Sequence, residues 1–178
     1  MLTKNDPKKV EAGRLIFRAP RASDGPQMYA LIDRCKPLDL NSRYCYLILC
    51  EHFFSTCVVV ERDENIIGLI TAYRRPDQPE TLFIWQVAVD QSMRGQGLAK
   101  RMMQHLFAQP SLADITAIEA TVNPSNHASR ALFHSMAATV DARVDETPLF
   151  AASIFGAGDH EQENLIRVHP LSLDPSGK

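Results

Sequence analysis

The 178-residue sequence lacks the features that mark several large classes of protein. No apolar run approaches membrane-spanning length, and the first residues, MLTKNDPKKVEAGR, lack the apolar core of a signal peptide. We therefore expect a soluble, cytoplasmic protein. The formal net charge is only -2, so the composition gives no reason to expect nucleic acid or an anionic membrane surface as a partner. Small molecules are the expected partners.

Cysteine is scarce, and its spacing does not match the common metal and redox motifs. The four cysteines, at positions 35, 45, 50 and 57, include no C-x-x-C pair, and three lie in apolar runs such as YCYLILC. We expect buried, reduced thiols. The segment Asp159-His160-Glu161-x-Glu163 contains metal-binding residue types but no second histidine at a zinc spacing, so no metal is expected.

Repeats and low-complexity segments are also absent, and 45% of the residues are hydrophobic. A chain of this length and composition builds one packed core. We expect a single domain at 15–173, with tails at 1–14 and 174–178.

The periodicity and the turn residues predict alternating helices and strands, an α/β (α+β) class. Helices are expected from the Ser23–Pro26 opening to 35, at 43–54, from 98 to about 109, and from a cap at Ser125 or Asn126 to 136. Strands are expected at 15–18, 57–61, 66–73, 81–89, 115–122, 149–155 and 164–168. The helix at 43–54 is apolar on nearly every side and is expected to be largely buried.

The segment from Thr81 to Met103 carries the strongest functional pattern. It is predicted to be a strand, a glycine turn and a helix, and a helix start offers unpaired N–H groups and partial positive charge to an anion. The P-loop pattern G-x-x-x-x-G-K-[ST] is absent, and the dinucleotide pattern G-x-G-x-x-G fails because Lys100 stands where the third glycine belongs.

The remaining pattern, R-x-x-G-x-A at Arg94, Gly97 and Ala99, resembles the acetyl-coenzyme A loop of the GNAT acyltransferases. That resemblance implies the GNAT fold, with a mixed, mostly antiparallel sheet splayed between two parallel central strands and flanked by helices. It also implies acetyl-CoA as co-substrate. The residues that would bind it are Val87, Ala88, Val89, Arg94, Gly95, Gln96, Gly97, Leu98, Ala99, Lys100 and Asn126.

Three further stretches resemble one branch of that superfamily, the diaminobutyrate acetyltransferases of ectoine synthesis. They are PLDLNSRYCYLILCEHFFSTCVVVE at 37–61, FIWQVAV at 83–89 and FGAGDHEQENLIR at 155–167. The resemblance implies acetyl transfer to the γ-amine of L-2,4-diaminobutyrate, and a homodimer.

A diamine substrate needs acidic groups and a base. Asp39, Trp85, Gln86 and Glu163 are the predicted substrate-binding residues. Trp85 either faces the cationic substrate or packs in the core against Phe83 and Val87, which lie on the same strand face by period two. Asp39 is otherwise a turn residue, and the acidic loop that carries Glu163 is otherwise a solvated surface.

The predicted catalytic groups are Tyr44 and Glu161 as proton carriers and the backbone N–H of Val89 as oxyanion donor. A core tyrosine is the alternative for Tyr44. Many GNAT enzymes have a tyrosine seven residues after the asparagine as general acid, and here that position is Phe133. Two other functions therefore stay open: acetylation of another small amine or amino acid, and a non-catalytic acetyl-CoA-binding regulator.

Overall fold

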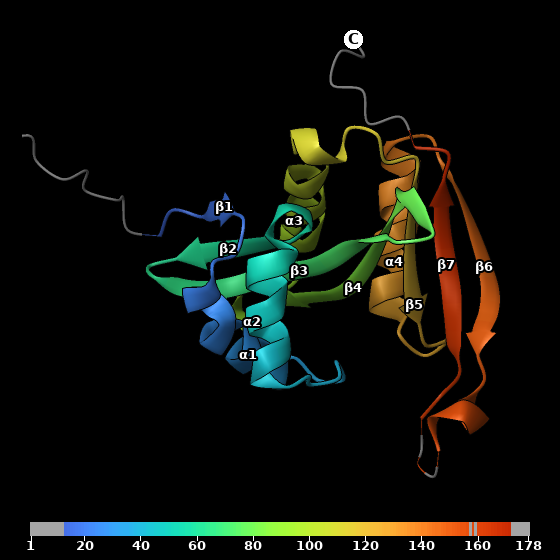
Figure 1. The fold of residues 1–178 in the computed structure, drawn as a ribbon, viewed down its shortest axis with the longest axis horizontal. Coiled ribbons are helices and arrows are strands. Elements are labelled where there is room, and N and C mark those ends of the chain that lie inside the picture. Colours follow the sequence, from blue (N-terminus) through green and yellow to red (C-terminus); the bar gives the residue numbers. More distant parts are fainter. Residues whose placement is uncertain (1–12, 157, 159, 172–178) are drawn as a thin grey trace, which may run out of the picture.

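The computed structural model describes residues 13–156, 158 and 160–171, and in this part of the chain seven strands form one sheet (Figure 1). The strands are β1 (Ile16–Arg18), β2 (Val58–Arg62), β3 (Asn65–Arg75), β4 (Gln78–Val89), β5 (Ala117–Val122), β6 (Arg143–Phe150) and β7 (Glu163–His169). Their order is β1-β2-β3-β4-β5-β7-β6, and among these neighbours only β4 and β5 are parallel. The expected mixed, mostly antiparallel sheet is confirmed.

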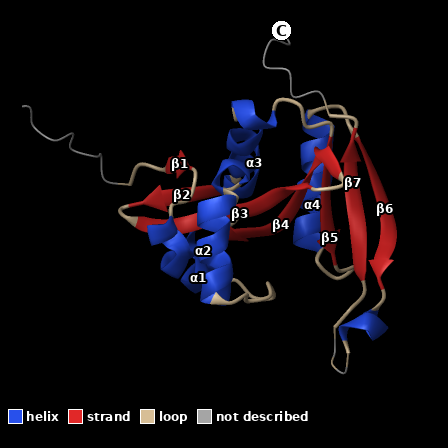
Figure 2. Ribbon diagram, viewed as in Figure 1, coloured by secondary structure: helices blue, strands red, loops and turns tan. Residues whose placement is uncertain are grey.

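Four helices of the described chain cover the two faces of this sheet (Figure 2). They are α1 (Gly25–Asp33), α2 (Arg43–His52), α3 (Leu98–Phe107) and α4 (His127–Thr139). Met28 and Tyr46 of α1 and α2 are buried in one cluster with the β3 residue Leu69. Met102 of α3 and Phe133 of α4 belong to a second cluster, on the opposite face. Among the described residues, no helix has the length and apolar character needed to cross a lipid bilayer.

Helices α2 and α4 begin at side-chain caps that the sequence offers. Ser42 caps α2, and its Oγ accepts from the backbone N–H of Cys45 at 3.2 Å. Asn126 caps α4, and its Oδ1 accepts from the backbone N–H of Ser129 at 3.1 Å. Of the two candidate caps at the start of α4, the structure therefore uses Asn126.

Some sequence-based expectations for the elements are wrong. Residues 143–150 form β6, whereas the predicted strand at 149–155 is mostly the 3-10 helix Ala152–Phe155. Residues 74–80, expected to be a loop, mostly extend β3 and β4. Helix α2 is not largely buried, since Tyr44 is 69% and Leu47 39% exposed. The predicted tails fall almost entirely outside the described residues, so the domain limits stay predictions.

Candidate active site

Strand β4 carries an extra residue at Trp85. The flanking residues Ile84 and Gln86 pair with consecutive residues of β3, so Trp85 forms a β-bulge. In a regular strand, side chains three residues apart point to opposite faces of the sheet. The bulge changes this alternation, and Ile84 and Val87 contact the same core cluster. The predicted shared face of Phe83, Trp85 and Val87 is therefore wrong. The indole of Trp85 is 43% exposed, which also contradicts the core alternative.

The parallel strands β4 and β5 diverge beyond their first three pairs. Thr81–Phe83 pairs with Ala117–Glu119, while the rest of β5 pairs with β7. From Ile84 to Val89, cavities rather than a neighbouring strand lie along the β5 side of β4. Backbone N–H and C=O groups on this edge are available to a ligand.

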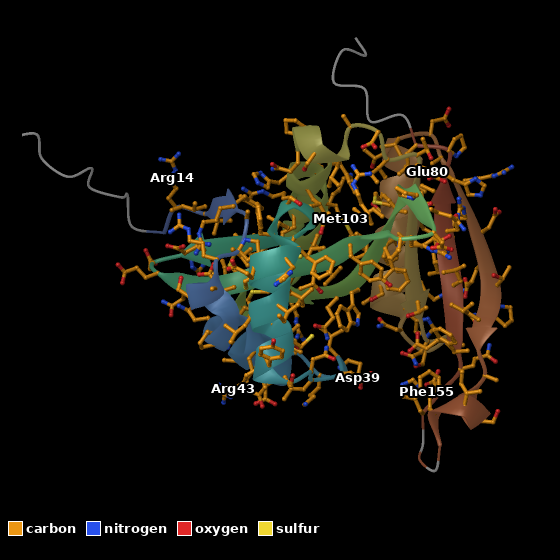
Figure 3. All side chains as sticks on the ribbon, viewed as in Figure 1. Arg14, Asp39, Arg43, Glu80, Met103 and Phe155 are labelled. Atoms are coloured by element: carbon orange, nitrogen blue, oxygen red, sulfur yellow. The ribbon has the colours of Figure 1, made fainter. Side chains whose placement is uncertain are left out.

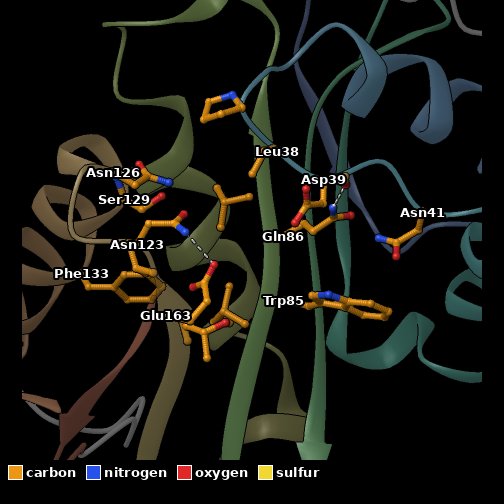
Figure 4. Close-up of a pocket in the computed structure, with 16 residues that line it drawn as sticks. Leu38, Asp39, Asn41, Trp85, Gln86, Asn123, Asn126, Ser129, Phe133 and Glu163 are labelled. Atoms are coloured by element: carbon orange, nitrogen blue, oxygen red, sulfur yellow. Dashed lines mark hydrogen bonds between the residues drawn. The ribbon is translucent and has the colours of Figure 1, made fainter. Parts of the chain in front are cut away.

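The inner cavity, of about 230 Å³, lies between β4, β5 and the loop that joins α1 to α2. Asp39, Trp85, Gln86 and Glu163, the four predicted substrate-binding residues, all line it. Figure 4 shows Asp39, Gln86 and Trp85 on one side, with Glu163, Asn123 and Phe133 facing them from the other. The structure thus brings together residues that are far apart in the sequence.

Glu163 is the most chemically distinctive group in the inner cavity. Its Oε1 accepts a hydrogen bond from Nδ2 of Asn123 at 3.0 Å, and its buried Oε2 has no partner among the described residues. Burial raises the pKa of the Glu163 carboxyl above its ordinary value, against the opposing effects of His160 and Asn123. A partly buried carboxylate with a raised pKa that lines a cavity is a candidate to accept a proton from a ligand.

A second cavity, of about 310 Å³, lies between Cys35, the end of β4 and helices α3 and α4; we call it the helix cavity. Val87, Ala88, Val89, Arg94, Ala99 and Asn126, all predicted coenzyme-binding residues, line it. The Val89 carbonyl accepts from Nε of Arg94 at 3.2 Å and from Sγ of Cys35 at 3.5 Å. The oxyanion role of the Val89 N–H stays a prediction.

The turn before α3 has the geometry of an anion site. Gly95 and Gly97 have φ of 73° and 71°, a left-handed conformation that favours glycine, and a Cβ at either position would meet no atom within 4 Å. Gly97 is the N-cap of α3 and provides no side-chain cap, so the first N–H groups of the helix stay available. The side chains of Gln96 and Lys100 are exposed, and that of Leu98 is buried in the core.

The two cavities adjoin. Pro37, Leu38, Val87, Asn126 and Ser129 line both of them. A ligand in the helix cavity can therefore reach a ligand in the inner cavity beside Val87, the β4 residue common to both.

Glu161 lies farther out than Glu163. It lines a third, outer cavity of about 450 Å³, together with Asp39 and His160, and its Oε2 accepts from the backbone N–H of Ser125 at 3.3 Å. The His160 ring stacks on Phe155 at 3.8 Å between centroids, and its Nε2 lies 3.9 Å from Oδ2 of Asp39. Figure 3 shows Asp39 and Phe155 at the same end of the molecule.

The structure does not bring Tyr44 to these cavities. Its side chain is exposed, and the buried tyrosine of α2 is Tyr46, two residues later. Tyr44 as a proton carrier stays a prediction that its position does not support. The sequence interpretation also missed Asn123 and Ser129, although both flank Asn126, which it did select.

Comparison with known proteins agrees with this geometry. Residues 25–137 match the acetyltransferase (GNAT) family. The L-2,4-diaminobutyric acid acetyltransferase of Bordetella parapertussis is 42% identical over 167 residues, which cover 93% of this chain and 90% of the relative. The enzyme of the same name from Vibrio cholerae is 43% identical over 159 residues, or 86% of this chain and 88% of the relative. The chain belongs to the L-2,4-diaminobutyric acid acetyltransferase family.

A solved member of this family has the same fold. It is diaminobutyrate acetyltransferase EctA from Paenibacillus lautus, in complex with L-2,4-diaminobutyric acid and coenzyme A. The two chains align with a TM-score of 0.86 and 42% identity, covering 89% of this chain and 96% of the other. The GNAT fold predicted from the sequence is confirmed. Within the described residues, no group of three or more histidine, cysteine or acidic side chains is arranged to hold a metal ion.

Proposed function

We propose that this protein transfers the acetyl group of acetyl-CoA to the γ-amine of L-2,4-diaminobutyrate, giving N-γ-acetyl-L-2,4-diaminobutyrate, a step of ectoine synthesis. One observation carries the proposal. The predicted acceptor-binding residues Asp39, Trp85 and Glu163 line one cavity, and that cavity joins the coenzyme loop side of β4 at Val87. The relatives named above are acetyltransferases for this amino acid.

Acetyl-CoA fits the helix cavity. The uncapped start of α3, the open glycines Gly95 and Gly97, and Arg94 suit its pyrophosphate. Val87 to Val89 would lie along the arm that ends in the thioester. The thioester carbon would then face the inner cavity at Val87.

Diaminobutyrate fits the inner cavity by charge. It carries two ammonium groups and one carboxylate, and the cavity is lined by Asp39, Glu163 and Trp85, which provide two carboxylates and an indole. A cation against an indole ring contributes roughly 0.5 to 2 kcal/mol, depending on desolvation. We assign Glu163 to the reacting γ-ammonium and Asp39, at the open side, to the α-ammonium.

The reaction requires removal of a proton from the γ-ammonium. An alkyl ammonium has an unperturbed pKa of about 10 and is almost fully protonated near neutral pH. The carboxylate of Glu163 accepts one of its protons, directly or through water, and the nitrogen lone pair then attacks the thioester carbon. In this assignment Glu163 has the role that the sequence gave to Glu161. The backbone N–H at Val89 stabilises the oxyanion that forms.

Collapse of the tetrahedral intermediate breaks the C–S bond, and the electron pair leaves with the sulfur. The nitrogen, which still carries two protons after the attack, gives up one of them to solvent to form the amide. Phe133 lines the inner cavity where many GNAT enzymes have a tyrosine. A thiol has a pKa of about 8.5, so the thiolate is protonated by solvent near neutral pH without a strong acid.

The experiment is a panel of amines incubated with the purified protein and acetyl-CoA, with release of free thiol followed over time. Diaminobutyrate should give the highest kcat/KM, ahead of ornithine, lysine and spermidine. Preference for ornithine or spermidine would indicate a different acceptor. Release with none of the amines would indicate an acetyl-CoA-binding regulator instead.

A homodimer is the second part of the proposal. Leu149, Phe150, Ile154 and Phe155, at the end of edge strand β6 and in the turn after it, are each at least 41% exposed. Contiguous apolar exposure of this kind is typical of an interface, and the occupant that we propose is a second copy of the chain.

Light scattering after gel filtration tests the dimer. The wild type should be dimeric, and Ile154→Asp, at a position 64% exposed, should be monomeric. Phe54→Asp, at a 51% exposed position in the 3-10 turn after α2, is the matched control and should stay dimeric. Dissociation by the control alone would move the interface to α2, and a monomeric wild type would exclude the dimer.

The cytoplasm is the location that we propose. Cys35, Cys45, Cys50 and Cys57 are all free, which fits a reducing compartment. Fractionation of cells that express the protein tests this, and recovery in the periplasmic or extracellular fraction would contradict it.

A further inference from the structure

Gln86 lines the inner cavity, yet both ends of its side-chain amide bind the protein itself. Nε2 donates to the backbone oxygen of Asp39 at 2.7 Å, and Oε1 accepts from the hydroxyl of Tyr46 at 3.2 Å. The side chain is only 5% exposed. These bonds leave one N–H of the amide without a partner in this set. Gln86 therefore joins β4 both to α2 and to the loop between α1 and α2.

Tyr46 extends the same network. Its side chain is fully buried, and its hydroxyl also accepts from the backbone N–H of Asn41 at 3.4 Å. Two backbone groups of the loop, the oxygen of Asp39 and the N–H of Asn41, thus depend on the pair formed by Tyr46 and Gln86. A loop lacks the regular backbone hydrogen bonds by which a helix or a sheet pairs such groups.

The position of Gln86 next to the bulge makes this network relevant to the site. Because Trp85 is the extra residue of β4, the side chain of Gln86 points toward α2 and Ile84 toward the opposite core cluster. The same short segment of β4 therefore presents the indole and anchors the loop that carries Asp39 (Figure 4).

We propose that Tyr46 and Gln86 are positioning residues that hold the Asp39 loop against β4, so that the acceptor site exists before the substrate binds. Neither residue touches the reacting atoms. This inference rests on the proposed function, and it differs from the sequence prediction, in which Gln86 binds substrate directly. It predicts that substitution of either residue weakens binding of the acceptor through the same network, and that binding of the coenzyme is unaffected.

The test combines steady-state kinetics on Tyr46→Phe, Gln86→Leu and the double variant. Tyr46→Phe removes one hydroxyl and leaves two polar groups unsatisfied, so the KM for diaminobutyrate should rise about tenfold. Gln86→Leu should raise it by more, and the double variant should raise it by less than the product of the two single increases, because both substitutions remove the same bond between Tyr46 and Gln86. The KM for acetyl-CoA should change by less than about twofold in all three.

Tyr29→Phe is the matched control. The Tyr29 ring packs edge-on against Tyr46, with centroids 6.2 Å apart, so this variant also removes a tyrosine hydroxyl from the same cluster. It should leave both KM values unchanged. Equal changes in the two KM values, or additive effects in the double variant, would overturn the positioning role.

Hydrogen exchange separates this inference from the proposed function. The backbone N–H of Asn41 should exchange faster in Tyr46→Phe than in the wild type and in Tyr29→Phe, whatever the acceptor is. If Asn41 exchanges faster in Tyr46→Phe but the wild type does not acetylate diaminobutyrate, the proposed function fails and the network stands. If diaminobutyrate is acetylated but exchange at Asn41 is unchanged, the network fails and the function stands.

Discussion

Asn123 and Glu163 are joined by a 3.0 Å hydrogen bond that occupies one carboxylate oxygen, and the other oxygen is buried with no partner among the described residues. Asn123 follows β5 directly and Glu163 begins β7, so two adjacent strands fix the direction of the carboxylate. Glu163 lines the inner cavity, where the acceptor amine would lie. Sheet topology therefore sets the position of the base that we propose.

Glu163→Gln should lower kcat roughly 100- to 10,000-fold, the usual range for loss of a positioned base. In the wild type, kcat/KM for diaminobutyrate should fall as the pH drops through the pKa of Glu163, which burial raises above that of an ordinary glutamate. A pH profile of kcat/KM measures this acid limb. Glu161→Gln, in the outer cavity, is the matched control and should keep both the wild-type kcat and the acid limb of the pH profile. If Glu163→Gln kept its activity and Glu161→Gln lost it, Glu161 would be the proton carrier, as the sequence predicted.

The same variant should not be less stable than the wild type near neutral pH. The pKa of Glu163 is higher in the folded than in the unfolded protein, so the folded state favours the protonated carboxyl. Its contribution to the free energy of unfolding is therefore fully present below the pKa of the unfolded state and is lost as the pH rises through the pKa of the folded state. A neutral glutamine avoids that loss. Thermal unfolding should give Glu163→Gln a Tm equal to or above the wild-type value near pH 7, with a smaller difference at acidic pH. A lower Tm near pH 7 would contradict the raised pKa.

Trp85→Ala should raise the KM for diaminobutyrate about tenfold, consistent with loss of a partly desolvated cation–π contact. The KM for acetyl-CoA should stay within about twofold, because Trp85 lines the inner cavity and not the helix cavity. Phe54→Ala removes an exposed aromatic ring away from both cavities and is the control. Equal changes in the two KM values would place Trp85 outside the acceptor site.

Gly97→Ala should raise the KM for acetyl-CoA several-fold with little change in that for diaminobutyrate. Its φ of 71° is strained for alanine, by about 1 kcal/mol, and it directly precedes the free N–H groups of α3. Gly13→Ala has the same kind of strain, with φ of 86° and open space around the Cβ, but lies far from the coenzyme loop in the sequence. It should lower stability without changing either KM. An unchanged KM for acetyl-CoA in Gly97→Ala would argue against the anion site.

Phe133→Tyr should leave kcat within about tenfold of the wild type, because a thiolate leaving group needs no strong acid near neutral pH. The Phe133 side chain is 2% exposed and lines the inner cavity, so the new hydroxyl would lie at its wall. Phe133→Leu controls for packing. A change much larger than tenfold in the tyrosine variant, with none in Phe133→Leu, would show that proton supply at this position limits the reaction.

The sequence points to candidate coenzyme-binding residues more directly than to candidate catalytic groups. Residues 94–100 combine glycines, an arginine and a helix start in one short segment, so a local pattern is enough to select them as candidates. The bulge at Trp85 depends on pairing with β3, and no pattern within β4 reveals it. A period-two interpretation therefore placed Phe83, Trp85 and Val87 on one face.

Other differences have the same origin in tertiary contacts. Tyr44 and Tyr46 both lie in an apolar helix, and only the direction of α2 against the sheet decides which of them is buried. Strand β6 has the polar segment 143–147 because it is an edge strand with exposed side chains, so no hydrophobic alternation marks it. The proposal of Glu163 rather than Glu161 as the base rests on the inner cavity, which Glu163 lines and Glu161 does not.

Identification of the product tests the central claim most directly. The protein is incubated with acetyl-CoA carrying a ¹³C-labelled acetyl group and with L-2,4-diaminobutyrate, and the product is examined by NMR. The proposed function predicts a single product with the acetyl group on the γ-nitrogen and the α-ammonium free. Acetylation of the α-nitrogen, or no acetylated product while thiol is released with another amine, would contradict it.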